Sequence, residues 1–162
     1  MNDKIPDNAG AQGAPLKVLV QYLKDLSFEN PGAPHIHMNR GEAPRAQLHL
    51  DVRARTIFPM QYEVSLILHI TAQREQETVY IVELEYAGLF DLSGLPEERI
   101  TPALMIEAPR MLFPFAREIL AKATRDGGYP PVLLNPIDFV AVFRDRAQRQ
   151  MEESVAAPAP TA

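Results

Sequence analysis

The sequence contains no cysteine and no tryptophan, and the missing cysteine removes several kinds of chemistry. Without cysteine, the chain forms no disulfide, offers no thiolate nucleophile and cannot build a cysteine-based zinc or iron–sulfur site. Long apolar runs are missing too. No segment approaches the roughly 18 apolar residues that a membrane span needs, so we expect no direct membrane insertion.

Positive charge is also in short supply, with 16 Lys and Arg against 21 Asp and Glu and a formal net charge of −5. Proteins that hold nucleic acid through phosphate contacts usually show a basic footprint, so we expect no nucleic-acid partner. The length of 162 residues and a hydrophobic content of 46% suit a single soluble domain.

The two ends of the chain differ in composition from the middle. Residues 1–15 are rich in Asn, Asp, Gly, Ala and Pro and lack the charged and apolar segments of a secretory signal, which predicts a disordered arm on a cytoplasmic protein. Residues 154–162 (SVAAPAPTA) predict a disordered tail. We therefore assign residues 16–153 to one folded domain.

Alternating apolar and polar residues mark three half-buried strands, at residues 47–53, 62–71 and 79–86. The connections at residues 58–61 and 72–77 are short, which favours antiparallel neighbours. Residues 16–26 (LKVLVQYLKDL) fit a strand imperfectly and a helical stripe equally well, and the residues alone slightly favour a helix.

Helical patterns follow the strands. Residues 112–124 place their apolar side chains on one stripe, and Gly127 and Gly128 end that helix. A second helix is expected at residues 135–153, with Asn135 as its N-cap and Pro136 at its first position. Strands followed by helices indicate an α+β domain with its helices on one side of an antiparallel sheet.

No catalytic motif is present, and two polar groupings have ordinary interpretations. His35 and His37 would lie on one side of an extended segment, but a metal site needs three or four convergent ligands, so surface histidines are the better interpretation. Glu83 and Glu85 point off one strand face beside Glu63. This face is interpreted as solvated, and it could dock a basic partner.

Three stretches in order carry a family resemblance: YLKDLSFENPGAPH at 22–35, YAGLFDLSGL at 86–95, and APRMLFPFARE at 108–118 followed by GGYPPVLLNPIDFVAVF at 127–143. In these segments the chain resembles the SecB protein-export chaperone family. The resemblance implies a four-stranded antiparallel sheet with two helices on one face, assembled as a dimer of dimers. It also implies that residues 16–28 form the first strand, against the helical preference above.

The function implied by the resemblance involves no catalysis and no cofactor. A cytoplasmic homotetramer holds unfolded precursor proteins in a translocation-competent state and delivers them to the SecA motor ATPase. Matching the family's motifs gives a SecA-docking patch of Asp25, Glu29, Ile81 and Glu83. The client-binding residues implied are Leu48, Leu50, Phe115, Phe139 and Phe143. The loop at residues 37–44 lacks the aromatic residue that some members carry there.

Two alternatives remain at this point. One is a SecB-like chaperone dedicated to a single partner such as an antitoxin. The other is a metalloenzyme that uses His35 and His37.

Overall fold

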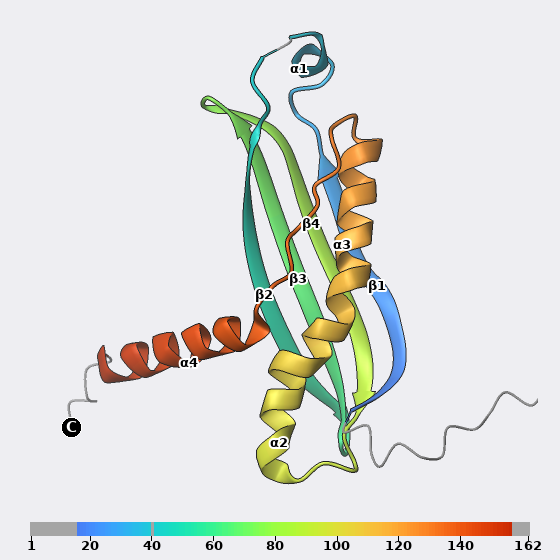
Figure 1. Ribbon diagram of the computed structural model, residues 1–162, viewed down its shortest axis with the longest axis vertical. Helices are drawn as coiled ribbons and strands as arrows, with labels where there is room; N and C mark the ends of the chain where they lie inside the picture. The colour runs from blue at the N-terminus through green and yellow to red at the C-terminus, as the bar shows by residue number, and fades with distance from the viewer. Residues whose placement is uncertain (1–15, 40, 157–162) are drawn as a thin grey trace, which may run out of the picture.

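A single antiparallel sheet organises the chain, and a computed structural model describes it over residues 16–39 and 41–156. The strands are β1 (Lys17–Glu29), β2 (Arg45–Phe58), β3 (Gln61–Arg74) and β4 (Glu77–Asp91). They lie in the order β1-β4-β3-β2 (Figure 1). The predicted α+β class and four-stranded antiparallel sheet are confirmed. The predicted disorder of residues 1–15 and 157–162 concerns segments outside the described residues.

Two tight hairpins join the last three strands, as the short connections predicted. Met60 and Glu75 take positive φ angles of 59° and 55° in these turns. The strands run for 14 or 15 residues, well beyond the alternating segments. Apolar residues of β3 and β4 with even numbers, such as Leu66, Leu68 and Leu84, are buried and face the core.

The ambiguous first segment is the strand β1, so the helical preference was wrong and the expectation from the resemblance is confirmed. β1 pairs with β4 along its whole length, with irregularities between Val18 and Val20 and between Leu23 and Asp25. Each irregularity interrupts the period of two. This interruption is why the alternation looked imperfect and a helical stripe fitted equally well.

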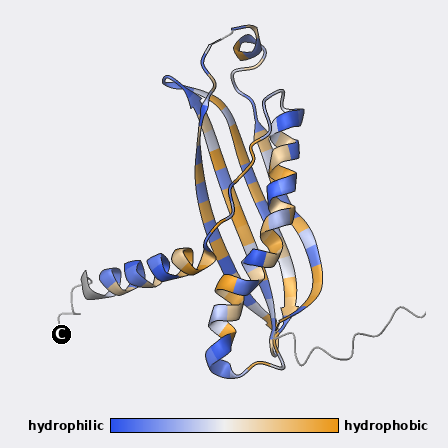
Figure 2. Cartoon of the chain, in the orientation of Figure 1, coloured by the Kyte–Doolittle hydropathy of each residue, from blue (hydrophilic) through white to orange (hydrophobic). Residues whose placement is uncertain are grey.

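One continuous helical segment packs against one face of the sheet, which we call the inner face (Figure 1). The opposite face is the outer face. It consists of α2 (Glu97–Pro102), the π-helical segment η1 (Ala103–Glu107) and α3 (Ala108–Asp126). The buried stripe of α3 includes Leu112, Ala116 and Leu120. Figure 2 shows the matching apolar stripes on the sheet beneath it. The helix predicted at 112–124 is therefore confirmed, with earlier and later ends.

The second predicted helix begins later than expected. Residues 127–138 form no helix, and α4 (Phe139–Ala156) starts after them. Asp138 caps it in place of Asn135, because its Oδ1 accepts hydrogen bonds from the backbone N–H groups of Val140 at 3.0 Å and Ala141 at 3.1 Å. α4 also takes in residues 154–156, which the sequence had assigned to the tail.

α4 does not lie on the sheet, so the expectation of two helices on one face is right for α3 and wrong for α4. The segment before α4 crosses the inner face beside α3, and its Val132, Leu134 and Ile137 pack against the core (Figure 1). Because this segment occupies the inner face beside α3, α4 projects from the β2 edge instead. Its start is the most apolar part, and its later turns are mainly hydrophilic, as Figure 2 shows.

An aromatic cluster closes the end of the molecule where α3 stops. Phe28 stacks on Tyr80 with ring centroids 5.7 Å apart, and Tyr80 lies 4.6 Å from Tyr129. The Tyr129 hydroxyl donates to Asn30 Oδ1 at 2.6 Å. The chain that leaves α3 at Gly127 passes so close that an added Cβ would lie 2.2 Å from Phe28 Cζ.

We predict that Gly127→Ala destabilises the fold by about 2 kcal/mol, because the Phe28 ring has to leave its stacked position. For a chain of this size the midpoint of thermal unfolding would fall by roughly 6 °C. Circular dichroism during heating measures this. Gly94→Ala is the matched control, because a Cβ there meets nothing within 4 Å. Equal midpoints for the two variants would contradict the prediction.

Candidate functional site

The outer face of the sheet, away from α3, collects the four residues of the predicted docking patch. In the register of β1 and β4, Glu29 pairs with Ile81 and Ser27 pairs with Glu83. Asp25, Glu29 and Glu83 are exposed and Ile81 is half-buried. We call Asp25, Glu29, Ile81 and Glu83 the acidic patch. The structure brings the four together on one surface, while their docking role stays a prediction.

Glu83 is held by a neighbour on β3. The Nδ1 atom of His69 lies 3.1 Å from Glu83 Oε1, and its Nε2 lies 3.1 Å from Thr71 Oγ1. A shallow hollow of about 260 Å³ opens here, bordered by Asp25 and Arg53 among others. The patch is thus partly pre-shaped, which reduces the ordering cost of binding.

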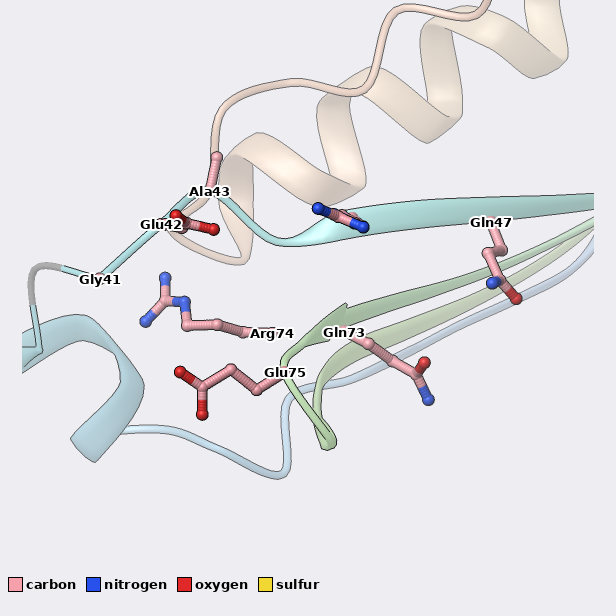
Figure 3. Close-up of a pocket in the computed structure, with 8 residues that line it drawn as sticks. Gly41, Glu42, Ala43, Gln47, Gln73, Arg74 and Glu75 are labelled. Atoms are coloured by element: carbon pink, nitrogen blue, oxygen red, sulfur yellow. The ribbon is translucent and has the colours of Figure 1, made fainter.

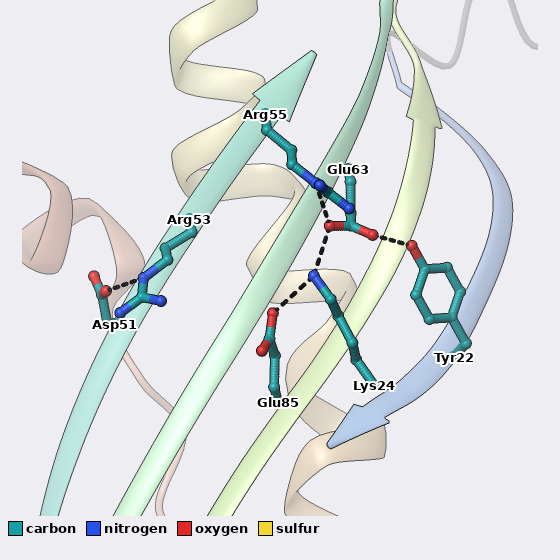
Figure 4. Close-up of polar contacts among 7 residues, drawn as sticks. All are labelled: Tyr22, Lys24, Asp51, Arg53, Arg55, Glu63 and Glu85. Carbon is teal, nitrogen blue, oxygen red and sulfur yellow. Dashed lines mark hydrogen bonds and ion pairs between the residues drawn. The ribbon is translucent and has the colours of Figure 1, made fainter. Parts of the chain in front are cut away.

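A buried carboxylate, Glu63, lies on the same outer face of the sheet and is shown with its partners in Figure 4. Glu63 is only 6% exposed, and it accepts hydrogen bonds from the Tyr22 hydroxyl, from Lys24 Nζ at 2.9 Å and from Arg55 Nε at 2.8 Å. Lys24 Nζ also lies 3.2 Å from Glu85 Oε1. The interpretation of this face as solvated is therefore wrong for Glu63. Its partners come from β1 and β2, the two edge strands.

The electrostatics of this group favour the ionised carboxylate. Burial raises the pKa of Glu63, but the hydrogen bonds from Arg55, Tyr22 and Lys24 outweigh it and lower that pKa to about 2. Burial, together with the hydrogen bond to Glu63, raises the pKa of Tyr22 to about 12. At neutral pH the carboxylate is charged and the phenol neutral, so each remains a good partner for the other.

Apolar surface remains open on the inner face beside β2. Leu48 is 41% exposed and Leu50 half-buried, since α3 packs over β4 and β3 instead. A hollow of about 500 Å³ beside α4 is lined by Leu50, Met105 and Phe143 among others. The structure thus places three of the five predicted client residues along one edge of the sheet.

The other two predicted client residues lie elsewhere. Phe115 is 51% exposed but stacks on Tyr86 with centroids 6.0 Å apart, towards β1. Phe139 is 1% exposed and packs edge-on to Phe113 at 6.1 Å. Its ring is part of the core in this chain, and the five residues do not form one continuous surface.

A third hollow, of about 470 Å³, lies between the start of β2 and the β3–β4 turn (Figure 3). Its lining includes Glu42, Arg45, Arg74 and Glu75, and Arg74 Nη1 reaches the backbone oxygen of Asn39 at 3.4 Å. This hollow is therefore polar, in keeping with a loop that lacks an aromatic residue.

The two neighbouring histidines do not converge. They lie in α1 (His35–Met38), a single helical turn, in which positions two apart point to different sides. His37 packs against Tyr129 at 4.9 Å. Across residues 16–39 and 41–156, no group of three or more His, Asp or Glu is placed to hold a metal ion. Nor is any helix in these ranges long and apolar enough to cross a membrane.

Sequence reasoning missed the Glu63 group. Alternation placed Glu63 on the outer face. It gave no sign that Tyr22 and Lys24, which lie 41 and 39 positions earlier in the chain, would cover its carboxylate. The only available signal was that β3 carries an acid among apolar and small residues, where a charge needs partners.

Comparisons with known proteins agree with this architecture. The family model "Preprotein translocase subunit SecB" matches residues 9–150. The "Protein-export protein SecB" of Maricaulis maris is 51% identical over 138 residues, which cover 85% of this chain and 80% of that protein. The protein of the same name from Paramagnetospirillum magneticum is 53% identical over 133 residues, covering 82% and 85%.

Among solved structures, the chain is similar to a SecB-like chaperone of Mycobacterium tuberculosis, determined in complex with a ChAD peptide from the HigA1 antitoxin. The TM-score is 0.64 at 21% identity, over 76% of this chain and 92% of that one. This likeness shows a shared fold. With the family match and the close relatives, it defines the class as an α+β export chaperone. The chain belongs to the SecB family.

We predict that the stability contributed by Glu63 depends on pH. Because folding lowers its pKa, the contribution is complete above the ordinary value of 4.5 and is lost as the pH falls towards about 2. Glu63→Gln should lower the free energy of unfolding on the order of 3 kcal/mol at pH 7, and by only about 1 kcal/mol near pH 2.5. Urea unfolding at both pH values measures the difference.

The control for this prediction is Glu83→Gln, an exposed carboxylate on the next strand. Its effect should stay within about 0.5 kcal/mol at both pH values. A Glu63→Gln effect of the same size at pH 7 and pH 2.5 would contradict the assignment.

Proposed function

We propose that this chain acts in the cytoplasm as a homotetrameric export chaperone, a dimer of dimers that binds unfolded precursor proteins, keeps them translocation-competent and delivers them to SecA. One observation carries the proposal: a single sheet presents open apolar surface beside β2 on its inner face and the acidic patch on its outer face. Family membership supports the chaperone role, and these two surfaces suit its two partners.

Client binding would use the β2 edge. An extended segment can place apolar side chains against Leu48, Leu50 and Phe143 while its main chain meets the edge strand. Such contacts demand no particular sequence, which suits many clients. Folded proteins offer no such segments, so selection would fall on chains that have not yet folded.

Assembly would use the opposite edge. Leu19, Val20, Leu23 and Leu26 on β1 are each 40–48% exposed. A long edge strand with this much apolar surface is a template for pairing with another chain, and a second copy of β1 would cover it. A tetramer would then offer one long client several grooves at high effective concentration.

Delivery would depend on charge. Three carboxylates at Asp25, Glu29 and Glu83 project from one face beside the apolar Ile81. This arrangement would attract a basic partner segment and give it one apolar contact, with an affinity that falls as salt screens exposed charge.

A dedicated single-partner role is the second candidate, because the fold neighbour was solved with an antitoxin peptide. A panel of unrelated unfolded precursors separates the two. Binding to most members of the panel supports the general chaperone, and binding to one alone supports the dedicated role.

We predict that light scattering shows a tetramer, which binds an unfolded precursor and does not bind the same protein in its native form.

We also predict that Leu48→Ser weakens precursor binding by about fivefold through lost apolar contact. Ile57→Ser is the matched control, since it lies at the other end of β2 with a similar exposure of 37%. Equal affinity for native and unfolded precursor would refute client selection, and equal loss in both variants would refute the site.

We predict that Glu83→Lys weakens SecA binding by about tenfold or more, because it reverses a charge in the centre of the acidic patch. Precursor binding should not change. Glu77→Lys, an exposed acid at the start of β4, controls for net charge. Titration calorimetry at two salt concentrations gives both affinities. Loss of precursor binding in Glu83→Lys would indicate misfolding, and equal loss of SecA binding in both variants would contradict a localised patch.

A further inference from the structure

β1 contains one extra residue directly before the two residues that it contributes to the acidic patch. Leu23 pairs with Tyr86 and Asp25 pairs with Glu85, the next residue on β4, so Lys24 has no Cα partner. This is the pattern of a β-bulge, in which two residues on one strand oppose one on the other. Bulges re-aim the side chains that follow them.

The bulge decides which residues of β1 face outwards. Before it, Val20 and Tyr22 pair with Leu89 and Ala87 on the outer face. After it, the outward positions are Asp25, Ser27 and Glu29. A strand without the extra residue would turn one of these two sets to the inner face, because side chains alternate. β1 is also an edge strand, held by ladder bonds from β4 alone within the described chain.

The side chain of the bulge residue is tied down on the outer face. Lys24 Nζ lies 2.9 Å from Glu63 Oε1 and 3.2 Å from Glu85 Oε1. Glu85 is the strand partner of Asp25, and Glu63 lies one strand further on, on β3. Tyr22, two residues before Lys24, bonds the same Glu63 carboxylate (Figure 4). Side chains from both β4 and β3 therefore hold the bulge.

We propose that Lys24 is a positioning residue for the acidic patch: its ion pairs with Glu63 and Glu85 hold the bulge, and the bulge turns Asp25 and Glu29 towards the partner. This inference rests on the proposed docking function. Lys24 is positively charged, whereas the acidic patch that it positions is negative.

Because Lys24 carries the opposite charge, the direction in which its removal changes the binding affinity tests the proposal. If Lys24 acted only through its charge, its removal would make the patch more negative and would tighten the binding of a basic partner. If Lys24 positions Asp25 and Glu29, its removal weakens binding although the patch gains negative charge.

The first measurement is the affinity of purified SecA for Lys24→Met, which keeps most of the length of the side chain and removes its charge. We expect binding about fivefold weaker than that of the unaltered chain. Arg53→Met is the matched control. It removes a cation that borders the same hollow and pairs with Asp51, away from the bulge. Its binding should be unchanged or tighter. Tighter binding by Lys24→Met would overturn the proposal.

The second measurement reads the register of β1 without SecA. Because the chain has no cysteine, the pair Ser27→Cys and Glu83→Cys introduces two thiols at paired outward positions. With oxidised glutathione as the oxidant, we expect the disulfide to form at least about threefold more slowly when Lys24→Met is added, since the side chain at position 27 no longer stays on the outer face. Lys24→Arg, which keeps the charge and the reach, should restore both readouts.

The two measurements separate the possible failures. If SecA binds neither the unaltered chain nor the variants, the docking function fails. The rate of disulfide formation between positions 27 and 83 still tests the bulge. An unchanged rate of disulfide formation in Lys24→Met overturns the positioning role. Should Lys24→Met fail to fold by circular dichroism, Lys24→Gln with the same two readouts decides.

Discussion

The structure depends on the pairing of β4 between β1 and β3. Its residues alternate between two environments, so one strand serves two purposes. Val82 and Leu84 are buried beneath α3, while Ile81 and Glu83 emerge on the opposite face. Neither set can be moved without moving the other, because the backbone links them with a period of two. Core packing thereby sets the spacing of the surface charges.

The Glu63 carboxylate is the costly element of this arrangement. A buried charge without partners would destabilise the fold by several kcal/mol. Here Tyr22 and Lys24 from β1 and Arg55 from β2 supply hydrogen bonds, so the charge joins three strands that are not all neighbours. Hydrophobic contacts tolerate sliding of one strand past another, whereas this group has only one good geometry. It adds side-chain specificity to an edge strand whose ladder bonds within the described chain come from β4 alone.

Much of the fold could be predicted from the sequence, and the failures have physical causes. Alternation located β3 and β4 because both have one buried face, and the resemblance corrected β1, whose bulges hide its period. The start of α4 was misplaced because Asn135-Pro136 is a plausible cap, whereas the chain still crosses the sheet beside α3 at that point and α4 begins only at Phe139. The acidic patch was predicted from the resemblance, and alternation alone would have indicated only its β4 members, Ile81 and Glu83. The Lys24–Glu63 contact was not predictable, because it spans 39 residues and an intervening strand.

The placement of the two surfaces on opposite faces of one sheet has a consequence for the order of events. Under the proposed function, a precursor bound beside β2 would leave the acidic patch uncovered, so the motor would not compete with the client for the same surface. If both proposed sites are used, client and motor would occupy the protein together, and the client would pass between them in a three-component complex without release into solution.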